Sequence, residues 1–243
     1  MSKKIRLGIN GLGRIGRQIY KICNDDPNID LVGINEINPD INNWVYTLNY
    51  DSIYGKAIHT TKKEEDYLVC KNNKIYTSHF LDISEVPWDK WGVDVIIDCS
   101  GVYKNVLRSR EIINLKKVKK ILITHSPDKV DFEMILGVNQ NNYDHNKHHL
   151  LSSGICDSTA IAPVTKLIND SYKILKGCVT TLHPWLSYQN LIDGPSSSWS
   201  FPGEVYHHYA LGRAAVGNII PKPTSAIQAV SKVVPEIDIN KIG

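Results

Sequence analysis

Short apolar runs of strand length alternate with helical patterns along the first part of the chain. Residues 5–9 and 30–35 form two such runs, and between them Ile15, Ile19 and Ile22 recur at the spacing of one helix face. Nearly continuous apolar runs, typical of strands buried on both faces of a parallel sheet, follow at residues 93–101, 120–124, 133–139 and 149–154. This alternation predicts an α/β fold with a mostly parallel sheet.

The pattern differs in the middle and in the last third of the chain. Residues 40–90 are polar and irregular, and no strand is assigned there. Beyond residue 155 the alternation gives way to a long helical pattern over 159–174. A later amphipathic helix is predicted over 224–234, with an apolar face of Ile227, Val230 and Val234. These changes predict two domains, 1–155 and 156–243.

The turn after the first strand carries a glycine pattern. Gly11, Gly13 and Gly16 form G-x-G-x-x-G between the strand and the helix, and Glu36 lies 20 residues after Gly16, at the end of the second strand. The glycines allow a tight turn, close approach of a pyrophosphate and close helix–strand packing, and the acid accepts hydrogen bonds from ribose hydroxyls. The pattern predicts a Rossmann-like doubly wound sheet that binds NAD rather than NADP; the alternative is a glycine turn of structural value only.

Composition and charge narrow the function class. The chain of 243 residues is 42% hydrophobic and 22% charged, with a net charge of +3, which suggests neither a nucleic-acid nor a membrane partner. No apolar run reaches the roughly 18 residues of a membrane span, and no signal peptide precedes the first strand. Five widely spaced cysteines without a C-x-x-C pair indicate neither a disulfide framework nor a metal site, which favours a cytoplasmic protein.

Several segments, in order, resemble the glyceraldehyde-3-phosphate dehydrogenase family. They are "GINGLGRIGR" (8–17), "WGVDVIIDCSGVY" (91–103), "GVNQNNYD" (137–144), "LLSSGICDSTAIAPVTKLINDSY" (150–172), "VTTLHPWLSYQNLIDGPS" (179–196) and "GRAAVGNIIPKPTSAIQAVSKVVPEI" (212–237). Because the motifs occur in register, the resemblance covers the chain from residue 5 to its end. It implies a Rossmann domain followed by an α+β catalytic domain.

The resemblance implies a catalytic pair. Cys156 matches the family's nucleophile and His183 its base, 27 residues later. An NAD-dependent aldehyde oxidation through a thiohemiacetal and a thioester is expected, with phosphate or water releasing the product. A position at a helix N-terminus would favour the thiolate of Cys156.

The resemblance also assigns binding residues. Thr224 and Ser225 are expected to bind substrate, and no metal ligand is expected. Cofactor binding is assigned to Asn10, Gly11, Gly13, Arg14, Ile15, Gly16, Glu36, Ser100, Gly101 and Thr124.

The chain departs from the family pattern around the nucleophile. Ile155 and Asp157 replace a serine and a threonine that help hold phosphate, and Asp157 adds a negative charge that opposes ionisation of the thiol and repels a phosphorylated substrate. Leu186 stands where a phosphate-binding threonine is expected. Smaller departures are Thr159 for asparagine, Ser225 for glycine and Leu81 for an arginine near the adenine.

Two functions remain open at this level. In the family, a further C-terminal part of the catalytic domain follows the segment that ends this chain, so the catalytic domain is expected to be incomplete, with exposed strand edges. The first function is a glycolytic, cytoplasmic, homotetrameric dehydrogenase that takes a small aldehyde and inorganic phosphate. The second is a truncated, non-catalytic NAD-binding protein of the same family.

Overall fold

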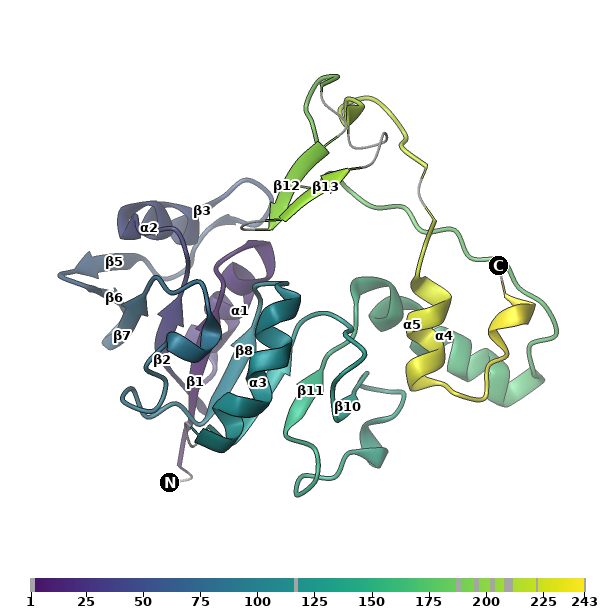
Figure 1. Ribbon diagram of the computed structural model, residues 1–243, viewed down its shortest axis with the longest axis horizontal. Helices are drawn as coiled ribbons and strands as arrows, with labels where there is room; N and C mark the ends of the chain where they lie inside the picture. Colours follow the sequence, from purple (N-terminus) through teal and green to yellow (C-terminus); the bar gives the residue numbers. More distant parts are fainter. Residues whose placement is uncertain are drawn as a thin grey trace. The chain divides into compact units, whose positions relative to one another are not determined.

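The chain divides into two compact units, Met1–Ile155 and Cys156–Gly243 (Figure 1). The computed structural model describes residues 3–115, 118–186, 189–194, 197–201, 204–207, 212–221 and 223–242, with the backbone alone for 197–201 and 204–207. The sequence motifs over 179–196 and 212–237 therefore include a few positions outside the described residues.

The first unit is built on a nine-stranded sheet in the order β10-β11-β9-β8-β1-β2-β7-β6-β5. Strands from β10 to β7 in this order pair in parallel, whereas β7, β6 and β5 pair antiparallel. The strands are β1 (Ile5–Asn10), β2 (Ile29–Asn35), β5 (Thr61–Glu64), β6 (Tyr67–Cys70), β7 (Asn73–Ser78), β8 (Val95–Asp98), β9 (Lys120–Ile123), β10 (Phe132–Glu133) and β11 (Leu150–Ser152). The expected α/β fold with a largely parallel sheet is confirmed.

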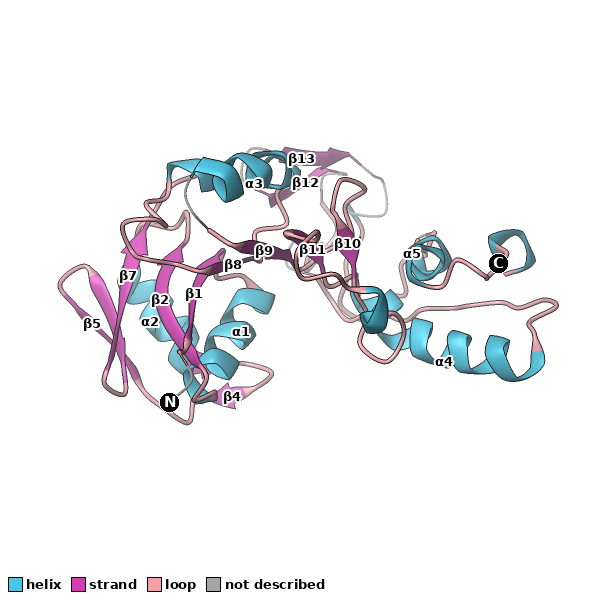
Figure 2. Ribbon diagram, turned by 90° about the horizontal axis from the view of Figure 1, so that it is seen from below, coloured by secondary structure: helices cyan, strands magenta, loops and turns pink. Residues whose placement is uncertain are grey.

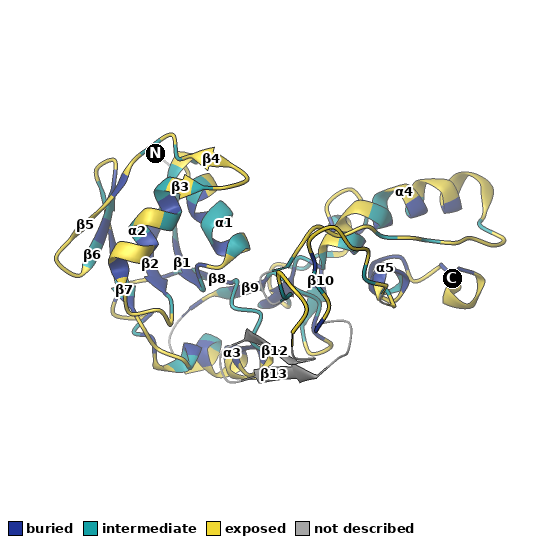
Figure 3. Cartoon of the chain, turned by 90° about the horizontal axis from the view of Figure 1, so that it is seen from above, coloured by how far each residue is buried: buried dark blue, intermediate teal, exposed yellow. Residues whose placement is uncertain are grey.

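Helices cover both faces of this sheet, as a doubly wound fold requires (Figure 2). Helices α1 (Arg14–Asp25) and α2 (Ile41–Asn49) lie on one face, and α3 (Tyr103–Leu115) lies on the other. Successive strand residues point to opposite faces, and Ile96 of β8 lies beside Gly8, the residue before Ile9 on β1. Ile9 therefore joins a core with Tyr20 and Trp44 on one face, whereas Ile96 joins a core with Val106 and Trp88 on the other. The central strands are buried along most of their length (Figure 3), which explains their continuous apolar runs.

The buried face of α1 differs from the apolar stripe in the sequence. Ile15 and Ile22 are 51% and 65% exposed, while Gly16, Tyr20 and Cys23 are buried. A Cβ at Gly16 would lie within 2 Å of the Gly11 carbonyl oxygen, so the helix packs on the loop through its glycine. The helix itself is where the spacing predicts it, but its inner face is formed by Gly16, Tyr20 and Cys23, and of the three isoleucines Ile19 alone packs against the core.

The apolar run at 133–139 is a turn for most of its length, and the expected strand there is wrong. Strand β10 ends at Glu133. The side chain of buried Asn139 donates to the Glu133 carbonyl and accepts from the Ile135 amide, which closes a turn that contains Gly137 at φ +83°. An apolar run of this length does not by itself specify a strand.

The middle region is more regular than its polar sequence suggests. It contains α2, the antiparallel strands β5 to β7 and a short hairpin of β3 (Tyr50–Asp51) and β4 (Gly55–Lys56). Short 3-10 turns follow in the same unit: η1 (Ile83–Glu85) and η2 (Gln140–Asn142). Asp40 caps α2 by accepting from the Asn42 amide, and Trp44 and Trp88 are fully buried. The buried apolar side chains of this region are spread over several short elements, so no single run in the sequence shows a clear period.

The second unit contains two helices packed against each other (Figure 1). These are α4 (Cys156–Tyr172) and α5 (Ala226–Val233), with a hairpin of β12 (Ser197–Phe201) and β13 (Glu204–His207) and a 3-10 turn η4 (Ile239–Lys241). The expected face of α5 is confirmed, since Ile227, Val230 and Val234 are all buried. Helix α4 begins three residues earlier than its pattern suggested, at Cys156 itself.

Candidate active site

Cys156 is the first residue of α4 and is exposed to solvent. Its sulfur therefore lies in the first helical turn, where the helix dipole favours negative charge. Asp157 also lies in this first turn, with a side chain 15% exposed. The helix start thus holds a thiol and a carboxylate side by side.

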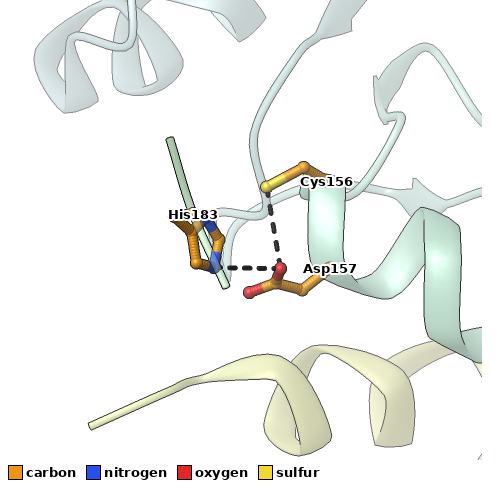
Figure 4. A group of neighbouring side chains, drawn as sticks. All are labelled: Cys156, Asp157 and His183. Carbon is orange, nitrogen blue, oxygen red and sulfur yellow. Dashed lines mark hydrogen bonds and ion pairs between the residues drawn. The ribbon is translucent and has the colours of Figure 1, made fainter. Parts of the chain in front are cut away.

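The Asp157 carboxylate joins the thiol to His183 (Figure 4). One oxygen, Oδ1, lies 3.9 Å from the Cys156 sulfur and 3.3 Å from His183 Nε2. The thiol sulfur, a carboxylate oxygen and a ring nitrogen all lie within 4.8 Å of one another. The structure therefore brings Cys156 and His183 together, with an acid between them that the family resemblance does not supply.

The segment that carries His183 is fixed to the end of the chain. Gly177 donates its amide to the Lys241 carbonyl, and Gly177 pairs with Ile242 in an isolated bridge. Nearer the histidine, the Thr181 hydroxyl donates to Thr224 Oγ1 at 3.4 Å. These contacts hold an otherwise irregular segment close to α5.

The expected substrate residues lie at the start of α5. Thr224 Oγ1 also accepts from the Ala226 amide at 3.1 Å, and Ser225 is the N-cap residue without a side-chain capping bond. Thr181 joins Thr224 to the His183 segment, and no spacing in the sequence marks this residue. Leu186 places an apolar side chain three residues after His183.

The remaining cysteines differ in exposure. Cys23, Cys70 and Cys99 are partly or fully buried in the first unit, and Cys178 is exposed in the second. Burial raises the pKa of the Cys23 thiol to about 11, and burial together with neighbouring Asp98 also raises the pKa of Cys99. Buried thiols of this kind are poor nucleophiles.

The glycine loop of the first unit has the shape of a phosphate cradle. Gly11 adopts φ +92°, and a Cβ there would lie 2.9 Å from the Ser100 amide nitrogen. Gly13 is the N-cap of α1 and has no side-chain capping bond, and a Cβ on it would meet nothing within 4 Å. The open space at Gly13, in front of helix amides, fits the pyrophosphate of NAD.

Glu36 closes the same loop from the end of β2. Its Oε2 accepts from the Leu12 amide at 2.6 Å and its Oε1 from the Asn38 amide at 3.2 Å. The carboxylate is therefore held beside the glycine turn. This position fits the ribose of a dinucleotide.

A polar network lies beneath the cradle, at the carboxyl ends of β1, β2 and β8. The side chain of Asn10 donates to Asp98 Oδ1 at 2.9 Å, and Asn35 donates to Asn10 at 2.8 Å. Burial raises the pKa of Asp98, although hydrogen bonds from Ser100 and Asn10 oppose the shift. Asn35 and Asp98 were missed in the sequence, although both are polar residues that end an apolar run, which is a usable signal.

The other expected cofactor residues lie around the same edge of the sheet. Ser100 accepts through its hydroxyl from the Val102 amide, and Gly101 adopts φ +69°. The Thr124 hydroxyl donates to the Asp98 carbonyl at 3.2 Å. Arg14 and Ile15 open α1, directly after the glycine loop. The structure thus gathers all ten residues at one end of the sheet. Leu81, which stands where the family has an arginine near the adenine, is 61% exposed.

Comparisons with known proteins agree with this architecture. Residues 5–106 match the family profile "Glyceraldehyde 3-phosphate dehydrogenase, NAD binding domain", and residues 155–242 match "Glyceraldehyde 3-phosphate dehydrogenase, C-terminal domain". The first profile supports NAD as the cofactor.

Curated relatives match nearly the whole chain. Glyceraldehyde-3-phosphate dehydrogenase 2 of Caenorhabditis briggsae is 34% identical over 97% of this chain and 67% of the relative. Glyceraldehyde-3-phosphate dehydrogenase 1 of Kluyveromyces marxianus is 34% identical over 96% and 67%, and that of Bacillus subtilis (strain 168) is 30% identical over 96% and 66%. The chain therefore spans about two thirds of the length of these relatives. Within its described residues, none of the helices has both the length and the hydropathy that crossing a bilayer requires.

Proposed function

Because the chain belongs to the glyceraldehyde-3-phosphate dehydrogenase family, we propose that it oxidises an aldehyde with NAD at Cys156. Glyceraldehyde 3-phosphate or a related aldehyde is the proposed substrate. The observation that carries the proposal is the cluster at the start of α4, where an exposed thiol and an imidazole lie within 4.8 Å of each other. Such a pair is what covalent aldehyde chemistry requires.

The first step is the addition of the thiol to the aldehyde. His183 accepts the thiol proton, the Cys156 sulfur forms a bond to the carbonyl carbon, and the proton passes to the carbonyl oxygen. The product is a neutral thiohemiacetal on Cys156. His183 then takes the hydroxyl proton as the carbon is oxidised.

The loop of Gly11, Gly13 and Gly16 with Glu36 would hold the cofactor. Bound NAD would supply the hydride acceptor that this oxidation requires. The oxidised carbon remains on Cys156 as a thioester. An oxygen of phosphate or water then attacks that carbon, and the sulfur leaves as a thiolate.

Asp157 has two opposing electrostatic effects on this pair. Its carboxylate repels a thiolate 3.9 Å away and attracts an imidazolium 3.3 Å away. These effects largely cancel for a thiolate–imidazolium pair, because both lie close to the same oxygen. A phosphorylated substrate experiences only the repulsion, which favours an aldehyde without a phosphate or with a distant one.

The second candidate is an NAD-binding protein of the same family without turnover. Asp157 and Leu186 favour it, because a carboxylate and an apolar side chain stand where phosphate-binding side chains are expected. Both candidates keep the glycine cradle. They differ only in whether an aldehyde bound to Cys156 is oxidised and NAD is reduced to NADH.

The activity test follows NADH absorbance with purified protein, NAD, glyceraldehyde 3-phosphate and phosphate. Cys156→Ser is expected to abolish NADH formation, and His183→Gln to reduce it by at least about a hundredfold. Cys178→Ser is the matched control, because Cys178 is the other exposed cysteine. If the wild type forms no NADH from phosphorylated or unphosphorylated glyceraldehyde but still binds NAD, the second candidate is correct.

The cofactor test measures the melting temperature with and without NAD. We expect NAD to raise the melting temperature of the wild type. Gly13→Ala should melt like the wild type without ligand, because a Cβ there meets nothing within 4 Å, and Gly13→Val should lose the shift with NAD. An unchanged NAD shift in Gly13→Val would show that the cradle assignment is wrong.

Assembly, compartment and pathway are proposed from the family alone. We propose a cytoplasmic homotetramer with a role in glycolysis, which takes the substrate aldehyde and inorganic phosphate. Light scattering of the purified chain measures its mass in solution and tests the assembly.

A further inference from the structure

The cluster at the start of α4 contains three different metal-ligating groups. Cys156 offers a sulfur, Asp157 a carboxylate oxygen and His183 a ring nitrogen. Among the residues that the structure describes, this is the one such group of three within 4.8 Å. We propose that these residues bind a zinc ion reversibly, and that bound zinc blocks the thiol.

The distances between the ligand atoms suit a tetrahedral zinc ion. Zinc bonds of about 2.3 Å to sulfur, about 2.0 Å to nitrogen and about 2.1 Å to oxygen place tetrahedral ligand atoms roughly 3.3–3.6 Å apart. The His183 and Asp157 atoms are 3.3 Å apart, and the Cys156 and Asp157 atoms are 3.9 Å apart. The Cys156 sulfur and the His183 ring nitrogen lie within 4.8 Å of each other, so side-chain movements of at most about 1.3 Å would complete the geometry.

The ligand types select zinc over the common hard cations. A thiolate and an imidazole suit zinc, whereas magnesium and calcium prefer oxygen ligands alone. A thiolate and a carboxylate together balance the two positive charges of the ion. Asp157 is the decisive residue, because without it this cluster of described residues offers only two ligands.

The site is open to solvent. Cys156 is exposed, and the His183 side chain is 42% exposed. An ion can therefore enter directly, and water can fill its fourth position, as in three-ligand zinc sites. Since Asp157 and Cys156 share one helical turn, the two ligands are fixed by the same element.

Binding would change the chemistry of the thiol. The ion forms bonds to all three residues, and the thiol proton is released to solvent. The sulfur lone pair and the ring nitrogen are then engaged by the metal. The inhibition of aldehyde oxidation rests on the proposed function, whereas the metal site does not.

Binding is tested by titrating the full chain with zinc chloride in a calorimeter and with cobalt chloride in a spectrophotometer. We expect one ion per chain and a sulfur-to-cobalt charge-transfer band. Cys156→Ser should lose the band, and Asp157→Asn, nearly isosteric, should weaken zinc binding at least tenfold. Cys178→Ser should bind zinc like the wild type.

A second variant, Asp157→Thr, and the melting temperature of each metal-free variant guard against misfolding. Zinc binding that survives both Asp157 variants, or that disappears in Cys178→Ser, would overturn the site. The activity assay separates the two proposals. Zinc binding that depends on the three residues, in a chain that forms no NADH, would remove the proposed reaction and leave the metal site. Activity that persists while zinc is bound to these residues would remove the proposed block of the thiol and leave the metal site.

Discussion

The carboxylate of Asp157 contacts both members of the proposed catalytic pair. From the sequence, Asp157 is a negative charge next to a thiol, and it is expected to oppose ionisation. In the structure the same oxygen lies 3.3 Å from His183 Nε2 and 3.9 Å from the Cys156 sulfur, so it would stabilise an imidazolium and repel a thiolate. The unbalanced interaction is the one with an anionic substrate.

Replacing Asp157 by threonine should therefore change substrate preference more than the chemical step. We expect Asp157→Thr to lower KM for glyceraldehyde 3-phosphate at least about fivefold, because unit charges about 4 Å apart repel by about 1 kcal/mol even in water. KM for unphosphorylated glyceraldehyde should stay within about twofold. Steady-state kinetics with both aldehydes in metal-free buffer check this, and an equal change for both would contradict the charge argument.

Single elements are fixed by polar contacts that the sequence pattern does not reveal. Asp131 precedes β10, and its Oδ2 accepts from the amides of His149 and Leu150 at 2.9 and 2.8 Å. Arg110 of α3 lies 2.7 Å from the other oxygen. Burial raises the pKa of Asp131, but these hydrogen bonds and the Arg110 charge outweigh it and hold the pKa below its ordinary value of 3.8.

This depressed pKa predicts an acid-dependent stability. The folded chain binds the Asp131 proton less tightly than the unfolded chain, so the stabilisation is present above about pH 3.8 and is lost as the pH falls below it. Asp131→Asn should lower the melting temperature at pH 7, and the difference from the wild type should shrink at pH 3. Exposed Asp89 provides the control, Asp89→Asn, and a difference that does not depend on pH would contradict the assignment.

Apolar packing between α4 and α5 holds the second unit together. Ile227 is buried and Ile219 is 90% exposed, which makes them a matched pair. Ile227→Ala should destabilise this unit by about 2–5 kcal/mol, and Ile219→Ala by less than about 0.5 kcal/mol. Hydrogen exchange of the α4 amides, read by mass spectrometry, should accelerate only in the first variant, and equal exchange in both would show that α5 does not support α4.

At the scale of the whole molecule, the two units differ in how their cores are built. Both large hydrophobic cores, one on each face of the nine-stranded sheet, lie entirely within the first unit. The described part of the second unit buries its apolar side chains chiefly on α5. The first unit therefore has the means to fold independently.

We predict that residues 1–155, expressed alone, fold cooperatively and bind NAD. The expected result is one thermal transition that shifts upward with NAD, because the glycine cradle and Glu36 lie in this unit. The measurement also tests the domain assignment made from the sequence. A fragment that fails to fold would place the domain boundary elsewhere.

Much of the fold was accessible from the sequence because its signals are local. The apolar runs at 5–9, 30–35 and 120–124 are strands, and Gly11 has the positive φ that its place in the turn suggested. Errors arose where a local signal was ambiguous. The run at 133–139 could be a strand or a turn, and the buried side chain of Asn139, which closes the turn, cannot be read from periodicity.

By itself, the sequence determined the parallel α/β sheet, the glycine turn with its acid and the pairing of Cys156 with His183 through the family resemblance. These features depend on the distances between residues along the chain, which the sequence gives directly. Only the tertiary structure decided that α1 packs through Gly16, that Asp131 bridges three elements, and that Asp157 reaches His183. Asp157 and His183 are 26 residues apart, so their contact depends on how the irregular segment after α4 returns to the helix start, which no local pattern specifies.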